Sequence, residues 1–311
     1  MLFKPFYTIK LNNFKVYIQN TYLLCYNLKV GDFMRKAVKQ EKNRKIKKIN
    51  IILICFFSLL IVLSSIYIVK WFLDNGKTKN VEQNIEKISD VSEVQDSENT
   101  EIVEQEEVSK DDPYWDFIKM NLINVDFAKL KEKNSSTVGW IQVNGTNINY
   151  PFVQVDNNEY YLTHSFDKTN NAAGWIFLDY RNNIKNLNKN TIIYGHSRLN
   201  KTMFGSLINI FTNGWLNNSE NYVIKLSTET ENTLWQVFSI YHIPTTSAYL
   251  STTFSSEQEF LNFANMLLKR SQHNFKTKVS AKDYILTLST CYKDTERAVL
   301  HAKLIKREKR N

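Results

Sequence analysis

Cys291 is the side chain in this 311-residue chain that is best suited to nucleophilic chemistry. Of the three cysteines, Cys55 lies inside an uncharged apolar run and Cys25 precedes it, so Cys291 has no predicted disulfide partner. A lone thiol in an oxidising compartment is open to oxidation, so its presence there favours a chemical task. The alternative is a small buried residue at a strand end, because cysteine is often buried.

A nucleophilic cysteine needs a proton acceptor or an imidazolium that stabilises its thiolate. His196 has the most suitable setting, because it ends the apolar run TIIYGH and precedes a polar loop. Its neighbour Gly195 permits a tight turn there. The other four histidines are predicted to lie within strands or loops without such a context: His164, His242, His273 and His301.

Acyl transfer also needs a donor for the developing oxyanion. Arg297 begins the run after Cys291, and a hairpin TLSTC-YKDTE-RAVLHA places the two close together across the turn. A permanently charged guanidinium suits that role, although an isolated arginine at a strand edge is more often a solvated charge.

These residues stand in a pattern that resembles the sortase family. LSTC at 288–291, Arg297 and the upstream YGHS at 194–197 are similar to the sortase signature. Four further blocks resemble its class B branch, and the resemblance covers nearly all of 113–311: VGWIQVNGTNINYPFVQ (138–154), DNNEYYLTHSF (156–166), AGWIFLDYRN (173–182) and MFGSL (203–207).

The resemblance implies a transpeptidase. Cys291 would attack the threonine carbonyl of a C-terminal sorting motif and form a thioester, His196 would exchange protons with the leaving and incoming amines, and Arg297 would stabilise the oxyanion. A peptidoglycan-precursor amine or a pilin lysine would resolve the thioester, and neither cofactor nor metal is expected. The residues implied to contact the substrate are Ser289, Thr290, Asn158 and Leu162. Some class B members carry an acidic residue two positions after the cysteine, where this chain has Lys293 followed by Asp294.

Eight short β-rich runs between polar turns predict the scaffold that positions these residues. The runs are 138–143, 148–155, 175–180, 191–196, 221–227, 233–243, 284–290 and 297–305. Eight strands in this length favour a closed barrel, because closure removes exposed edges. The resemblance implies the sortase-type eight-stranded barrel.

Helices are predicted beside the barrel. One covers 256–270, between the sixth and seventh strands, where Ser256 and Glu259 form a capping box and apolar residues recur at helical spacing. Shorter helices are expected within 113–130, as the N-terminal helix of the domain, and over 203–211.

A single membrane anchor is predicted at 49–72. Residues 49–69 carry no charge, and a helix of that length spans about 31 Å, close to the hydrocarbon thickness of a bilayer. A cleaved signal peptide fits less well, because the apolar run is longer than a signal core and no A-x-A-like site follows.

Charge indicates the orientation of this anchor. Residues 35–48 carry eight Lys or Arg and one Glu, which puts segment 1–48 in the cytoplasm and the rest outside the cell. Residues 1–33 lack a clear period and precede Met34, so translation is expected to begin at Met34. The basic run is less plausible as a nucleic-acid site beside a membrane span.

Two further segments complete the expected organisation. Segment 73–112 is acidic and poor in aromatic residues, which predicts a self-repelling stalk, and 113–311 is the predicted catalytic domain.

We weighed three alternatives to a transpeptidase from the sequence. A papain-type protease needs the cysteine before the histidine in the chain, and here the order is reversed. A metal site is disfavoured because the single exported cysteine and the scattered histidines lack a ligand spacing such as C-x-x-C or H-x-x-x-H. The main alternative is an inactive, anchored barrel that serves as a binding module.

Overall fold

The computed structural model describes residues 9–11, 14–16, 23–103, 108–110, 112–292 and 295–310, and for residues up to 30 and for 291–292 only the backbone is described. The chain divides into two units, Met1–Trp71 and Phe72–Asn311. The first contains a hairpin of β1 (Ile9–Leu11) and β2 (Phe14–Val16) and most of the long helix α1 (Leu23–Ile88), which continues into the second.

The predicted anchor lies within α1. The helix is long and apolar enough over Gly31–Ile88 to cross a membrane, and its apolar side chains at 49–69 are exposed rather than buried in the protein. The chain therefore offers one candidate membrane span among the described residues.

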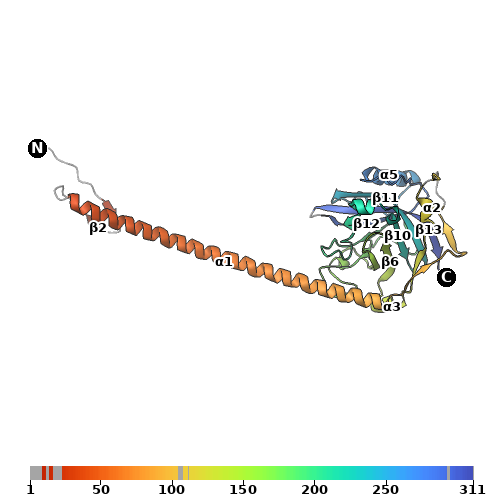
Figure 1. Ribbon diagram of the computed structural model, residues 1–311, viewed down its shortest axis with the longest axis horizontal. Helices are drawn as coiled ribbons and strands as arrows, with labels where there is room; N and C mark the ends of the chain where they lie inside the picture. The colour runs from red at the N-terminus through yellow and green to blue at the C-terminus, as the bar shows by residue number, and fades with distance from the viewer. Residues whose placement is uncertain are drawn as a thin grey trace. The chain divides into compact units, whose positions relative to one another are not determined.

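The second unit is built on an eight-stranded closed β-barrel, as the sequence predicts (Figure 1). Strand β13 pairs with both β12 and β11, and the second pairing closes the barrel. The strands around the barrel are, in order, β11 (Glu231–Pro244), β10 (Val223–Ser227), β6 (Thr137–Val143), β7 (Asn149–Val153), β8 (Phe177–Leu178), β9 (Asn190–Tyr194), β12 (Ile285–Tyr292) and β13 (Glu296–Lys309).

Alternation along these strands sends one set of side chains into the barrel and the other outward. Leu286 and Leu288 of β12 belong to the main core, whereas Ile285 packs in a second cluster outside the barrel. Helix α5 (Glu257–Arg270) covers that outer cluster and lies along β11 (Figure 1). The expected helix between the sixth and seventh strands is therefore present.

The N-terminal cap of α5 also follows the prediction. The Ser256 hydroxyl accepts a hydrogen bond from the backbone N–H of Glu259, at 3.2 Å. The Glu259 carboxylate reaches back to the backbone N–H of Ser255, at 2.7 Å, one residue before the N-cap. The first bond satisfies a donor that the first helical turn leaves unpaired, and the second ties the residue before the N-cap to the helix.

Segment 73–112, predicted to be a stalk, differs from that expectation over its described residues. Val81 and Ile85 of α1 are buried in the barrel core, β3 (Val91–Val94) pairs with β5 (Leu122–Val125), and β4 (Thr100–Ile102) pairs with β13. The segment is ordered because the core, β5 and β13 supply its packing and hydrogen-bonding partners. It therefore does not have to fold alone.

The helix expected within 113–130 is interrupted. One turn, α2 (Tyr114–Phe117), is followed by β5 and then by α3 (Ala128–Lys133). β5 forms because β3 provides its hydrogen-bonding partner, which the local sequence does not reveal. The helix expected over 203–211 is a short 3₁₀ turn; the remaining short elements are η1 (Tyr160–Leu162), η2 (Leu207–Phe211), α4 (Asn213–Leu216) and η3 (Ser219–Asn221).

Candidate active site

Strand register brings the three predicted catalytic positions to one level of the barrel. Cys291 of β12 is paired directly with Arg297 of β13. On its other side β12 runs parallel to β9, with Ser289 paired to Tyr194. His196 follows Tyr194 by two residues, as Cys291 follows Ser289. The backbone positions of all three residues therefore meet at the end of three adjacent strands.

The His196 side chain is fixed by the loop that contains η1. Its Nε2 lies 2.8 Å from the carbonyl oxygen of Leu162. The side chain of Leu162 is itself 38% exposed, so this loop reaches the surface beside the histidine. A ring nitrogen held by a backbone carbonyl has a defined orientation, which proton transfer requires.

Two glycines allow this close packing. Gly174 has a φ of +59°, and a Cβ atom there would lie 2.9 Å from Cδ2 of His196 and 2.4 Å from the carbonyl oxygen of Tyr161. A Cβ atom on Gly195 would lie 2.8 Å from the Phe204 ring. Gly195 is thus needed for close approach, rather than for the tight turn expected from the sequence.

Arg297 is partly exposed at the start of β13. Its guanidinium donates to the backbone carbonyl of Glu296, at 3.3 Å. Alternation puts it on the same face of β13 as Val299, which packs in the outer cluster beneath α5. The backbone of this partly exposed arginine therefore lies opposite that of Cys291.

The residues implied to contact substrate are in different environments. Ser289 and Thr290 are each 3% exposed; the Ser289 hydroxyl lies 2.9 Å from that of Tyr249, and Thr290 Oγ1 has no hydrogen-bond partner among the described residues. Asn158 is engaged internally, with Nδ2 donating to Asp179, at 3.1 Å, and Oδ1 accepting from the Tyr180 N–H. Their substrate contacts stay a prediction. Lys293 and Asp294 lie outside the described residues.

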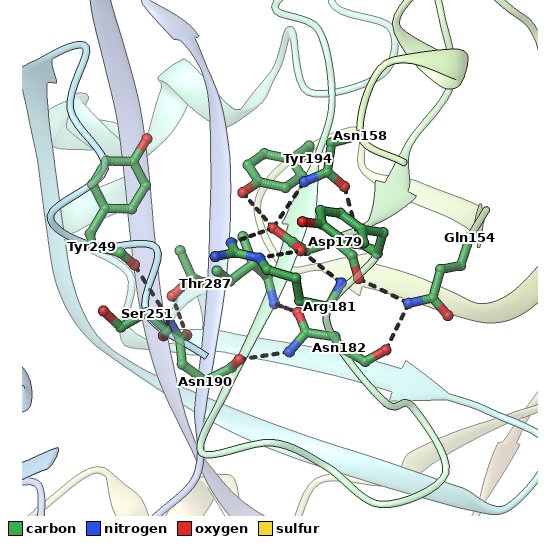
Figure 2. Close-up of polar contacts among 12 residues, drawn as sticks. Gln154, Asn158, Asp179, Arg181, Asn182, Asn190, Tyr194, Tyr249, Ser251 and Thr287 are labelled. Atoms are coloured by element: carbon green, nitrogen blue, oxygen red, sulfur yellow. Dashed lines mark hydrogen bonds and ion pairs between the residues drawn. The ribbon is translucent and has the colours of Figure 1, made fainter. Parts of the chain in front are cut away.

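Asp179 is a supporting residue that the sequence did not single out (Figure 2). Its fully buried carboxylate accepts hydrogen bonds from Arg181, at 2.7 Å and 2.9 Å, from the Tyr194 hydroxyl, at 2.9 Å, and from Asn158. It therefore joins the strand end that precedes His196 to the loop that contains Leu162. Although Asp179 lies within the block AGWIFLDYRN (173–182), its role depends on partners from three separate segments, which the sequence does not bring together.

The charge at Asp179 is maintained despite burial. Burial alone raises the pKa of this carboxyl, but the hydrogen bonds from Arg181 and Tyr194 outweigh it and hold the pKa below its usual value. Burial, and the charge of Asp179, raise the pKa of Tyr194 in turn, so its hydroxyl stays a donor. The network is thus a stable ion pair with a neutral tyrosine.

His301 has a structural environment, in contrast to His196. It is fully buried, with Nδ1 2.8 Å from the Thr287 hydroxyl and Nε2 2.8 Å from the Tyr241 hydroxyl. Because Thr287 donates its own proton to Asn190, at 2.7 Å, it accepts from His301 Nδ1–H. Burial lowers the pKa of His301 to about 3, so this imidazole is neutral.

Comparison with known proteins agrees with this geometry. A sortase domain model matches residues 141–305. Sortase B of Staphylococcus aureus is 36% identical over 188 residues, covering 59% of this chain and 76% of that protein, and sortase B of Listeria monocytogenes is 35% identical over 186 residues, covering 58% and 74%.

Solved structures show the same relationship. The S. aureus sortase B–substrate complex is similar with a TM-score of 0.55 and 36% identity, covering 58% of this chain and 84% of that chain. Bacillus anthracis sortase B, in complex with AAEK1, has a TM-score of 0.59 and 34% identity, covering 76% and 99%. The chain therefore belongs to the sortase family, in its class B branch.

Proposed function

We propose that this sortase is a membrane-anchored cysteine transpeptidase with Cys291 as nucleophile, His196 as acid and base, and Arg297 as oxyanion donor. The observation that supports the proposal is the strand register, which pairs Cys291 of β12 with Arg297 of β13 and Ser289 of β12 with Tyr194, two residues before His196. The substrate is a surface protein with a C-terminal sorting motif, cleaved after threonine.

The reaction proceeds in two acyl transfers. The Cys291 thiolate attacks the threonine carbonyl carbon, and Arg297 donates to the oxyanion of the tetrahedral intermediate. The C–N bond breaks as His196 protonates the leaving amine, which yields a thioester. An incoming amine, from a peptidoglycan precursor or a pilin lysine, gives its proton to His196 and attacks the thioester, and the C–S bond breaks to release the Cys291 thiolate. Water in place of the amine gives slow peptide hydrolysis.

The rest of the chain serves to hold the site at the outer face of the membrane. In this proposal residues 1–48 are the cytoplasmic segment, 49–72 form the anchor and 113–311 the catalytic domain. The basic flank at 35–48 supports this orientation through the preference of such flanks for the cytoplasmic side.

The test uses the full chain in detergent micelles with quenched fluorescent peptides that carry candidate sorting motifs, with and without an amine acceptor. We expect motif-dependent cleavage and, by mass spectrometry, an amine-linked product. Cys291→Ala should abolish both, whereas the matched Cys55→Ala, which removes a thiol in the apolar span, should leave them unchanged. Absence of any reaction, with a Cys291 that resists thiol probes in the folded protein, would favour the inactive binding module instead.

A further inference from the structure

The first turn of α1 in the barrel unit, residues 74–78, contacts the loop that follows His196 and the loop between β7 and β8 that packs against its ring. We infer that this turn is a positioning device for the His196 imidazole, with Asn75 and Thr78 as positioning residues. The inference rests on the proposed role of His196 as catalytic acid and base.

The first contact is with the loop after His196. The Oδ1 atom of Asn75 accepts hydrogen bonds from the Arg198 guanidinium and from Asn200 Nδ2, the latter at 3.3 Å. The loop closes on itself immediately beyond, because the Phe204 N–H donates to the carbonyl of His196, at 3.0 Å. Fixing Arg198 therefore fixes the backbone on the C-terminal side of the histidine.

The second contact is with the loop between β7 and β8, which contains η1. Asn171 is 1% exposed, and its Nδ2 donates to Thr78 Oγ1, at 3.0 Å, and to the Asp74 carbonyl, at 3.4 Å. Its backbone N–H donates to the carbonyl of Thr163, and its carbonyl accepts from the N–H of Gly174, at 2.9 Å and 3.0 Å. Asn171 thus connects the helix to the residues that surround the imidazole.

The histidine ring lies against this second loop. Leu162 presents its carbonyl oxygen to Nε2, at 2.8 Å, and Gly174 lies so close to Cδ2 that a methyl group would not fit. A shift of the loop relative to the strand end would move the carbonyl away from the ring. The helix turn opposes such a shift because it is hydrogen-bonded to both sides.

The chemistry of the turn supports a positioning role over simple packing. Thr78 is 1% exposed, yet it is polar, and its hydroxyl donates to the Asp74 carbonyl, at 2.9 Å, while accepting from Asn171. Val81 and Ile85, one and two turns further on, already supply the apolar contacts of the helix with the core. Directed hydrogen bonds fix relative position more narrowly than apolar contacts do.

The inference is tested with the variants Thr78→Val and Thr78→Ser, made in the full chain and kept in detergent micelles. Steady-state kinetics with a cleavable peptide gives kcat and KM for each. Valine keeps the shape but removes the hydroxyl, and we expect kcat to fall about tenfold with KM within twofold, because misplacement of a catalytic group reduces rate more than binding. Serine keeps the hydroxyl and should restore kcat. Asn75→Leu and Asn75→Asp form a second pair, since aspartate retains the acceptor.

Ile85→Ala is the matched control on the same helix. It should lower the unfolding temperature and leave kcat, measured well below that temperature, unchanged. If Thr78→Val and Asn75→Leu keep kcat within twofold, or if Ile85→Ala reduces it as much as they do, the inference is wrong. An active His196→Ala variant would instead overturn the proposed function, so the two failures are distinguishable.

Discussion

Arg297 is the residue on which the proposed oxyanion role depends. Its backbone lies opposite Cys291, and its partly exposed guanidinium makes one 3.3 Å hydrogen bond to a neighbouring carbonyl. A planar guanidinium can place two donors on one oxyanion, whereas an ammonium acts as a point charge.

Arg297→Lys should therefore lower kcat by about 10²- to 10³-fold, the range typical for loss of an oxyanion donor, although the positive charge is kept. Pre-steady-state formation of the acyl-enzyme with a peptide substrate measures the affected step directly. Arg307→Lys is the control, because Arg307 lies near the other end of β13 and pairs with Glu231 instead of substrate. Equal acylation by the parent and Arg297→Lys would remove Arg297 from the oxyanion role.

His301 makes stability dependent on acid. Its folded-state pKa of about 3 lies below the ordinary value of 6.5, so below pH 6.5 the unfolded chain binds a proton that the folded chain does not. Stability is therefore lost as the pH falls from 6.5 toward 3, by about 3 kcal/mol at pH 4.5 relative to pH 8.

His301→Gln should flatten this part of the profile, because glutamine does not titrate, while lowering stability at pH 8, because an amide does not reproduce the stacking of the ring on Phe238. Urea unfolding of residues 72–311 at pH 8 and pH 4.5, for parent and variant, gives the difference. An unchanged difference between the two pH values would show that another group causes the acid sensitivity.

At the scale of elements, α5 depends on its N-terminal cap. The Ser256 hydroxyl satisfies the Glu259 N–H, and the helix buries Phe260, Phe263, Ala264 and Leu267 against the outer cluster. The cap thus fixes where the apolar face begins.

Ser256→Ala should lower the free energy of unfolding by about 1 kcal/mol and the unfolding temperature by about 2–4 °C. Gln258→Ala, an exposed change in the same helical turn, should alter stability by less than about 0.5 kcal/mol. Differential scanning calorimetry measures the unfolding temperatures of both variants. Equal effects of the two substitutions would contradict a stabilising role of the Ser256 cap.

Short β-rich runs between polar turns sufficed to predict the eight barrel strands, because the strands are mostly buried and the turns between them are polar. The same approach missed β3 and β4, because they are short and polar and form only against β5 and β13. Within the site, Cys291, His196 and Arg297 were predicted from the lone thiol, from the setting of the histidine and from the sortase-like motifs that contain them. Asp179 and Gly174 escaped notice because their importance arises from tertiary contacts.

At the scale of the molecule, the barrel unit begins at Phe72, well before the predicted catalytic domain. Val81 and Ile85 each bury an apolar side chain in the core, worth roughly 1.5–3 kcal/mol apiece. The start point of a soluble fragment therefore determines both stability and, through Asn75 and Thr78, activity.

We expect residues 72–311 to be more stable than 89–311 by about 3–6 kcal/mol, from the two apolar side chains. Residues 80–311 keep both side chains and should approach the stability of 72–311, yet lose kcat because they lack Asn75 and Thr78. Urea unfolding and peptide cleavage on the three fragments check both statements. Equal stability of 72–311 and 89–311 would contradict the packing argument.

The C-terminal hairpin of β12 and β13 has a consequence for biogenesis. Ribosomal synthesis delivers β6 to β11 first, and until Ile285–Lys309 follow, β9 and β11 have open edges and the barrel has a gap. The same hairpin contains the thiol and the arginine. The nucleophile and its neighbours are therefore assembled in the step that seals the barrel, so a partly synthesised chain has no reactive centre.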